Sequence, residues 1–108
     1  MNVLLLSPGY PAEMPEFARG LAEVGATVFG VGDQPAERLP ERTRRALAAY
    51  IQVRSLFDEA RCIEELRGQL RGRRIDRVES LWEPLMLLAA RLREALGVAG
   101  LGVAATVP

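Results

Sequence analysis

The pattern of apolar and polar residues begins with an unbroken apolar run at residues 2–7. Strands with one solvated face alternate apolar and polar residues, so a run without alternation predicts a strand buried on both faces, as in a parallel sheet between helices. Pro8 and Gly9 then interrupt the run. Residues 13–24 place apolar side chains at helical spacing, and Gly25 follows where a helix commonly ends. The start of the chain therefore predicts a strand, a turn and a helix.

The rest of the chain repeats this alternation. Further strands are expected at 26–32, 50–54 and 75–81, a short helix at 41–48, a helix between Ser55 and Gly72, and a last helix at 84–96. Ser55 is the expected N-cap of the third helix, because Asp58 follows it as in a capping box. The expected apolar stripe of that helix is Ala60, Ile63, Leu66 and Leu70.

Strands that alternate with helices predict an α/β fold: a three-layer α/β/α, Rossmann-like domain with right-handed crossovers. We expect a parallel sheet of four or five strands in the order 3-2-1-4, with residues 98–104 as a short fifth strand beside the fourth. Residues 1–108 fit a single domain.

The carboxyl ends of the first and fourth strands would face each other at the switch point of this sheet, where open α/β sheets bind ligands. Five residues follow those strand ends and are the candidate site: Gly9, Tyr10, Glu13, Trp82 and Glu83. Each also has a structural explanation. Gly9 suits a plain turn, Glu13 and Glu16 suit the first turn of a helix, and Trp82 with Glu83 suits a partly buried ring beside a capping carboxylate.

Composition narrows the chemistry. The chain contains no histidine, and its 14 basic residues are all arginine. Histidine base or metal chemistry, Schiff bases and phosphate-binding lysines are therefore excluded. Gly9 is the single glycine of the first turn, whereas dinucleotide binding needs three, although Asp33 stands where a ribose-binding acid would lie. We expect no catalytic residues, cofactor or metal in this chain alone.

Charge and hydropathy limit the partners. Charged residues make up 26% of the chain, and the net charge is zero. The overall charge therefore does not favour binding to nucleic acid or to an anionic membrane. No apolar run approaches the ~18 residues of a membrane span, and we see no secretion signal. One cysteine, Cys62, fits a reducing, cytoplasmic location, and its place near an apolar stripe suggests an inert buried thiol.

A basic cluster begins in the last turns of the third predicted helix and continues beyond it. It consists of Arg67, Arg71, Arg73, Arg74 and Arg77. A solvated face is the expected role, and contact with an anion or an acidic partner is the alternative.

Three segments resemble the N-terminal, pre-ATP-grasp domain of ATP-grasp ligases. They are N-V-L-L-L-S-P-G-Y-P-A-E-M-P at 2–15, R-I-D-R-V-E-S-L-W-E-P at 74–84, and A-A-R-L-R-E-A-L-G-V-A-G-L-G at 89–102. The last is similar to the segment that leads into the ATP-binding domains of biotin carboxylase-like and carbamoyl-phosphate-synthase-like members. Together the segments extend the resemblance over the whole chain.

The resemblance implies a domain that packs on a downstream ATP-grasp domain and lends residues to the acceptor-substrate side. It also implies that ATP and Mg²⁺ bind to the later domains, so that this domain is inactive alone. In D-alanine ligases a glutamate near the first helix holds a substrate amine, and Glu13 or Glu16 could match it.

Two other functions stay open on the sequence alone. One is a non-catalytic interaction or dimerisation module, and a homodimer through the candidate site would also fit an ATP-grasp domain. The other is the N-terminal half of a two-domain glycosyltransferase, which also opens with a strand and a proline-glycine turn. The apolar end of the chain at Pro108 suggests that a further domain follows.

Overall fold

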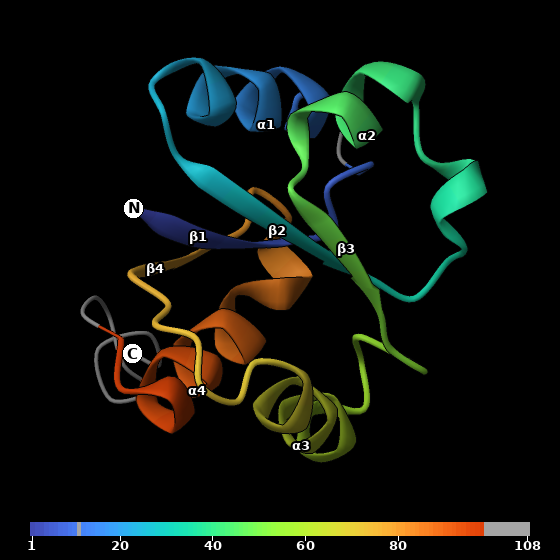
Figure 1. Ribbon diagram of the computed structural model, residues 1–108. Coiled ribbons are helices and arrows are strands. Elements are labelled where there is room, and N and C mark those ends of the chain that lie inside the picture. Colours follow the sequence, from blue (N-terminus) through green and yellow to red (C-terminus); the bar gives the residue numbers. More distant parts are fainter. Residues whose placement is uncertain (11, 99–108) are drawn as a thin grey trace.

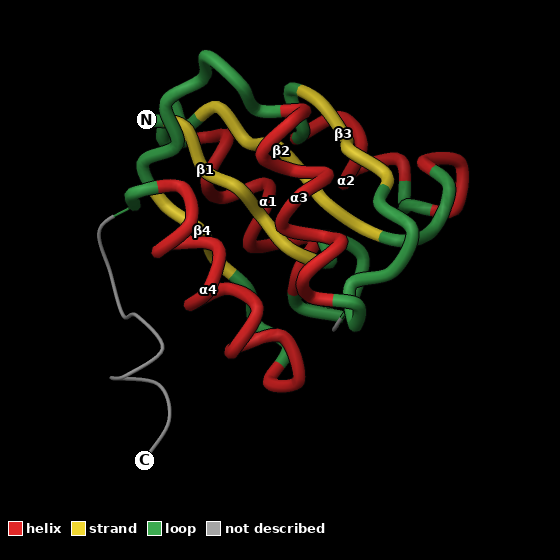
Figure 2. The backbone as a smooth tube through the Cα atoms, turned by 90° about the horizontal axis from the view of Figure 1, so that it is seen from below, coloured by secondary structure: helices red, strands yellow, loops and turns green. Residues whose placement is uncertain are grey.

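A computed structural model describes residues 1–10 and 12–98 of the chain (Figure 1). Four parallel strands form one sheet in the order β3-β2-β1-β4, which confirms the predicted fold class and strand order. Figure 2 shows β3 and β4 at opposite edges of this sheet. The predicted fifth strand, residues 98–104, lies outside the described residues apart from Val98.

The elements follow one another as the sequence predicts. They are β1 Asn2–Leu6, α1 Met14–Glu23, β2 Thr27–Gly32, the 3₁₀ turn η1 Ala36–Arg38, α2 Glu41–Ala46, β3 Ala49–Gln52, α3 Glu59–Gln69, β4 Arg77–Glu79, the 3₁₀ turn η2 Glu83–Leu85 and α4 Met86–Leu96.

The unbroken apolar run of β1 is explained by its central place in the sheet. Helices α1 and α2 cover one face of the sheet, and α3 and α4 cover the other (Figure 1). Leu4 and Leu6 belong to the core on the α3/α4 side, whereas Leu5 belongs to the core on the α1 side, and all three are fully buried. Successive side chains of a strand point to opposite faces, so both faces of β1 need apolar residues.

The two cores differ in size. On the α3/α4 side, Leu66, Leu88 and Leu92 belong to a large cluster that also includes residues of β1, β2 and β4. On the other side the buried cluster is four residues, Leu5, Met14, Ala18 and Val28. Most of the apolar burial that stabilises the fold therefore lies beneath α3 and α4.

The start of α3 differs from the prediction. Asp58, not Ser55, is the N-cap, and its carboxylate accepts a hydrogen bond from the Arg61 amide at 3.4 Å. The Ser55 hydroxyl accepts instead from the Phe57 amide at 3.1 Å. Leu56 is buried and its amide donates to Asp33 at 3.2 Å, which holds the chain in a loop and delays the helix.

The buried stripe of α3 is also rotated from the predicted one. Cys62, Leu66 and Leu70 are buried, Ile63 is half-buried, and Ala60 is exposed. The predicted place of Ala60 in the apolar stripe is therefore wrong, because the buried face is centred on Cys62, Leu66 and Leu70 and the helical spacing puts Ala60 on the opposite side. Among residues 1–10 and 12–98, no helix has the length and apolar character to cross a membrane.

Candidate functional site at the carboxyl edge of the sheet

The turn after β1 is held by its own hydrogen bonds. The Ser7 amide donates to the Val31 carbonyl at 2.7 Å, and the Ser7 hydroxyl donates to the Tyr10 carbonyl at 2.8 Å. Ser7 has φ 56°, in the left-handed region that a non-glycine residue rarely adopts. Such strain concentrates at functional sites and is of the order of 1–3 kcal/mol. Here the turn leaves Tyr10 56% exposed.

Three aromatic rings meet at this edge, and we refer to Tyr10, Phe57 and Trp82 as the aromatic cluster. The Tyr10 and Trp82 ring centroids are 5.0 Å apart with an interplanar angle of 76°, and those of Phe57 and Trp82 are 5.5 Å apart at 80°. These are edge-to-face contacts, a favoured geometry for aromatic pairs. The predicted convergence of Tyr10 and Trp82 is therefore confirmed.

The aromatic cluster is more exposed at its border than at its centre. Trp82 is half-buried and packs against the large core, whereas Phe57 is 59% exposed. Leu81 and Met86, adjacent in sequence to Trp82 and to η2, are also exposed. Large apolar side chains gathered at the ligand-binding edge of a sheet are suited to contact another surface.

Phe57 is a site residue that the sequence analysis missed. Reading Ser55 as the N-cap places Phe57 inside the first turn of a helix, where it has no special role. The available signal was Asp58, a good N-cap in its own right, which leaves the preceding aromatic residue in a loop. That loop follows β3, so it lies at the same carboxyl edge as Tyr10.

The candidate residues Gly9, Glu13 and Glu83 have different surroundings. A Cβ on Gly9 would lie 3.1 Å from Leu39 Cδ2, so close packing against the η1 loop explains this glycine. Glu13 is the N-cap residue of α1 without a side-chain capping bond, and Glu83 begins η2. Both carboxylates are exposed, and neither forms an ion pair with a described residue.

Glu16, the alternative to Glu13, is already engaged. Its carboxylate pairs with Arg19 at 2.8 Å and with Arg42 at 3.0 Å. The hydrogen bond from Arg19 lowers the pKa of Glu16 below its ordinary value, and the charges of Arg19 and Arg42 act in the same direction. Of the two glutamates near the start of α1, Glu13 is the one available to a ligand.

The polar groups of this region do not fit ATP and Mg²⁺. The first turn packs closely against Leu39, since a Cβ on Gly9 would lie 3.1 Å from Leu39 Cδ2. Asp33, the residue in the ribose-binding position, accepts a hydrogen bond from the Leu56 amide. Within the described residues no group of three acidic, cysteine or histidine side chains could hold a metal ion. With no lysine in the chain, no side chain here matches the phosphate-binding lysine of nucleotide sites.

The basic cluster divides into two parts. Arg74 pairs with Asp76 at 3.0 Å, Arg77 with Glu79 at 3.7 Å, and the Arg73 guanidinium lies 5.1 Å from the centroid of the Phe29 ring. These three arginines have structural partners. Arg67 and Arg71 form no ion pair with a described residue and lie along an open hollow on α3.

A parallel sheet in the order 3-2-1-4 between two helical layers defines a Rossmann-like α/β domain. The family model of the ATP-grasp N-terminal domain matches residues 21–100, and the chain belongs to this family. The match includes Phe57, Trp82 and Glu83, and it begins after Gly9, Tyr10 and Glu13.

A solved structure agrees with this fold. The chain is similar to the L-amino acid ligase from Bacillus licheniformis, with a TM-score of 0.74 and 20% sequence identity. The similarity covers 94% of this chain and 25% of the ligase chain, so this chain spans a quarter of that protein's length. No curated protein sequence matches the chain.

Proposed function

We propose that this chain is the N-terminal, substrate-side domain of an ATP-dependent carboxylate-amine ligase. Residues 1–108 form a single domain, and the ATP-grasp domains that bind ATP and Mg²⁺ follow it in the full-length enzyme. The domain is inactive alone. A biotin carboxylase-like or carbamoyl-phosphate-synthase-like enzyme is the variant that the resemblance of residues 89–102 favours, and the single buried thiol fits a cytoplasmic enzyme.

The aromatic cluster carries this proposal. Tyr10 and Phe57 expose more than half of their surface at the carboxyl edge of the sheet, next to exposed Leu81 and Met86. Exposure of apolar side chains to water is unfavourable, and a domain packed over them would remove that apolar area from solvent. We infer that the ATP-grasp part of the enzyme packs here and that the substrate cleft forms between the two parts.

Glu13 and Glu83 supply the polar side of the proposed cleft. Glu13 is the N-cap residue of α1, Glu83 is the first residue of η2, and both elements begin at this edge of the sheet. Both carboxylates are exposed, and both lack an arginine partner among the described residues. An ionised carboxylate forms a charge-assisted hydrogen bond with an ammonium group. We therefore assign Glu13 to the amine of the acceptor substrate and Glu83 to the border of the same cleft.

The membership of the ATP-grasp N-terminal domain family favours this function over half of a glycosyltransferase. The similarity in fold to an L-amino acid ligase also favours a ligase. At 20% sequence identity, this similarity does not identify the substrate of the present chain. An interaction module is compatible with the proposal, because one domain can contribute to a substrate cleft and also bind a second copy.

The test is the full-length enzyme assayed for ADP formation with pairs of carboxylates and amines. We expect ADP formation that depends on both substrates. Tyr10→Ala and Glu13→Gln should raise KM for the amine about tenfold, the factor that 1.4 kcal/mol of binding gives, and leave KM for ATP unchanged. Glu23→Gln, at the other end of α1, is the matched control and should change neither constant.

Two results would contradict the proposal. One is ADP formation that no pair of carboxylate and amine stimulates. The other is a Glu13→Gln enzyme in which KM for ATP rises and KM for the amine does not, which would place this edge on the nucleotide side.

A further inference from the structure

The chain contains three serines, and each lies shortly after a strand, at the carboxyl edge of the sheet. Ser7 directly follows β1, Ser80 directly follows β4, and Ser55 is the third residue after β3. All three are half-buried. Each residue of the aromatic cluster follows one of these serines by two or three positions.

Ser7 holds Tyr10 through two hydrogen bonds. The Ser7 hydroxyl donates to the Tyr10 carbonyl at 2.8 Å, and the Tyr10 amide donates to the Ser7 carbonyl at 3.3 Å. Both bonds close the same turn. Because Tyr10 is more than half exposed, these bonds determine where its ring leaves the backbone to a greater extent than packing does.

The Ser55 and Ser80 hydroxyls act on the other two aromatic residues. The sequence pattern is the same in both segments, Ser-Leu-Phe at 55–57 and Ser-Leu-Trp at 80–82. The Phe57 amide donates to the Ser55 hydroxyl at 3.1 Å, and the Trp82 amide donates to the Ser80 hydroxyl at 3.2 Å. A serine hydroxyl that accepts from the amide two residues later fixes the chain in a short turn. The same local bond is therefore present after β3 and after β4.

We propose that Ser7, Ser55 and Ser80 are positioning residues that order the aromatic cluster before any other molecule binds to it. Ordering side chains and loops during binding costs free energy, and a surface that is already ordered avoids this cost. The use of the aromatic cluster in binding rests on the proposed function, whereas the positioning of its rings by the serines does not.

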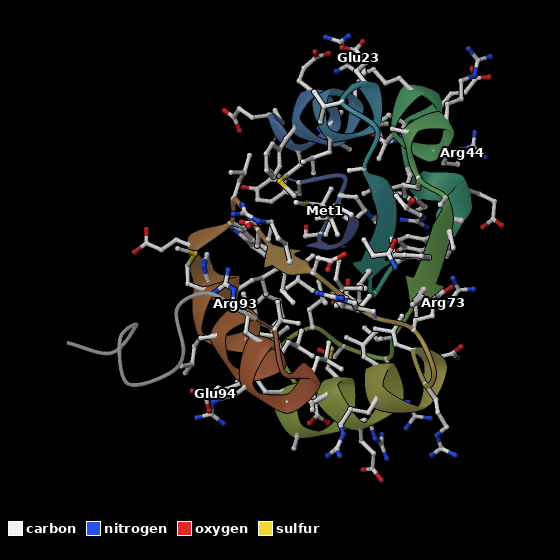
Figure 3. The ribbon with its side chains drawn as sticks, turned by 60° about the vertical axis from the view of Figure 1, so that its left-hand side comes forward. Met1, Glu23, Arg44, Arg73, Arg93 and Glu94 are labelled. Atoms are coloured by element: carbon white, nitrogen blue, oxygen red, sulfur yellow. The ribbon has the colours of Figure 1, made fainter. Side chains whose placement is uncertain are left out.

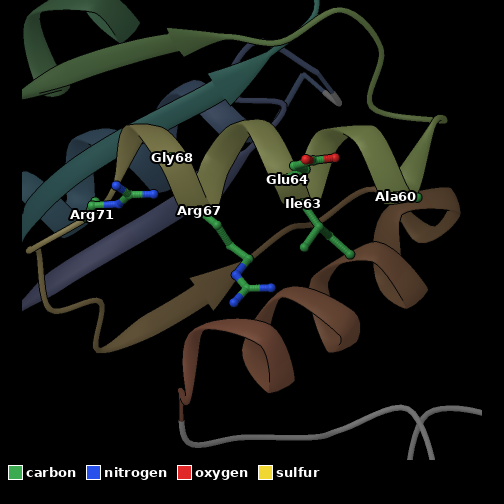
Figure 4. Close-up of a pocket in the computed structure, with 6 residues that line it drawn as sticks. All are labelled: Ala60, Ile63, Glu64, Arg67, Gly68 and Arg71. Carbon is green, nitrogen blue, oxygen red and sulfur yellow. The ribbon is translucent and has the colours of Figure 1, made fainter.

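Packing holds the centre of the aromatic cluster more firmly than its border. Trp82 packs against the larger core, whereas Tyr10 and Phe57 are mostly exposed and contact Trp82 edge to face. The open hollow shown in Figure 4 is lined by residues of α3 and its C-terminal end and by none of the three rings. It therefore does not position them, and the bonds from Ser7 and Ser55 matter most at the border.

Two measurements on this chain test the proposal. Trp82 is the single tryptophan, so quenching of its fluorescence by acrylamide reports how well the other two rings cover it. Ser7→Ala, Ser55→Ala and Ser80→Ala should each increase this quenching. In Ser55→Ala the Phe57 amide, and in Ser80→Ala the Trp82 amide, should exchange with solvent about fivefold faster, as expected for the loss of one hydrogen bond.

Double variants show whether each serine acts through its aromatic residue. In a Tyr10→Ala background, Ser7→Ala should cause no further quenching of Trp82, because the ring that Ser7 positions is absent. Ser55→Ala should likewise have no further effect in a Phe57→Ala background. A serine that only stabilises the fold would add its own effect in both backgrounds.

Two further variants separate the hydroxyl from backbone strain and from the loss of any hydroxyl. Ser7→Gly removes the hydroxyl and also relieves the positive φ, so it should melt at least about 4 °C above Ser7→Ala and yet allow the same quenching. Thr27→Val removes an exposed hydroxyl at the start of β2, at the opposite edge of the sheet, and should change neither measurement. Circular dichroism of each variant verifies that the fold is retained.

Two outcomes would overturn the proposal. The first is unchanged quenching of Trp82 in all three Ser→Ala variants. The second is an effect of Ser7→Ala that persists in full in the Tyr10→Ala background. These measurements do not depend on the assay of ADP formation. A full-length enzyme that no pair of carboxylate and amine stimulates would contradict the proposed function and leave the positioning of the aromatic cluster intact.

Discussion

The two helical layers that cover the sheet differ in how many of their surface charges form ion pairs. On the α1/α2 layer, Glu16 pairs with Arg19 and Arg42, Arg19 also pairs with Glu23, and Glu41 pairs with Arg45. Glu23 and Arg44 are labelled on the outside of this layer in Figure 3, and Glu94 on the outside of the other. On the other layer, Glu59 of α3 pairs with Arg91 of α4 at 3.2 Å, whereas Glu64, Arg67 and Arg71 have no ion-pair partner among the described residues.

The layers also differ in what lies beneath them. The α3/α4 layer covers the larger core, and the loops that enter its two helices hold the aromatic residues Phe57 and Trp82. The α1/α2 layer covers the smaller core, and several of its surface charges form ion pairs within the layer. Exposed pairs of this kind contribute little stability. The comparison indicates that most of the buried apolar contacts that stabilise the fold lie beneath the α3/α4 layer.

The largest expected effect tests the difference between the two cores. Leu66 is fully buried in the larger core, and Leu66→Ala should lower the free energy of unfolding by about 3–4 kcal/mol, the range for a well-packed leucine. Leu21 is half-buried beside the smaller core, and Leu21→Ala should cost about 1 kcal/mol. Denaturant melts of both variants measure the two losses. Equal losses would contradict the inference that the larger core contributes more to stability than the smaller one.

A second pair of variants separates the aromatic cluster from the core. Phe29 is buried in the larger core, so Phe29→Ala should cost about 3–5 kcal/mol. Trp82 is half-buried at the edge of the larger core, and its two aromatic contacts are to the exposed residues Tyr10 and Phe57, so Trp82→Ala should cost well under that range. Denaturant melts of the two variants measure both losses of stability. A loss for Trp82→Ala as large as that for Phe29→Ala would mean that Trp82 is a packing residue.

Cys62 tests how completely α3 seals the larger core. Burial, together with the nearby carboxylates of Glu65 and Asp33, raises the pKa of the Cys62 thiol to about 11. A raised pKa keeps the thiol protonated, so at about pH 8 a disulfide reagent should react at least ~100-fold more slowly than with the unfolded chain. The rate should increase as the pH approaches the thiol pKa. Equally fast reaction in both states would show that α3 opens readily.

The smallest expected effect concerns nucleotide. The chain has no lysine, and its first turn packs closely against Leu39, so titration with ATP and Mg²⁺ in a calorimeter should give no measurable heat of binding. A dissociation constant tighter than about 100 µM, or roughly 5.5 kcal/mol of binding, would contradict the assignment of the nucleotide to later domains.

Much of the fold could be predicted because its signals are local. The unbroken run of β1 indicates burial on both faces, and Gly25 and Gly97, both with positive φ, end helices at the predicted places. Val78 is the centre of β4 as expected, although the strand is shorter than the predicted one. Strand order then followed from the alternation of strands and helices.

The rest depends on contacts between distant segments, which a local pattern does not contain. The delayed start of α3 depends on Asp33, which accepts the Leu56 amide from the end of another strand. Phe57 joins the site only because of that delay. Gly9 has a packing role because Leu39, in the loop after β2, lies against it. That Glu64, Arg67 and Arg71 form no ion pair with a described residue can be seen only from the positions of their side chains, not from the sequence.

Hydrogen exchange of this chain compared with the full-length enzyme tests the central claim most directly. We predict slower exchange in the full-length enzyme, by at least about tenfold, at residues 7–10, 55–58 and 80–86, where the aromatic cluster lies. The amides of α1 and α2 should exchange alike in both proteins. Slower exchange confined to α1 and α2, or no difference at the carboxyl edge, would contradict the claim that this edge faces the ATP-grasp part of the enzyme.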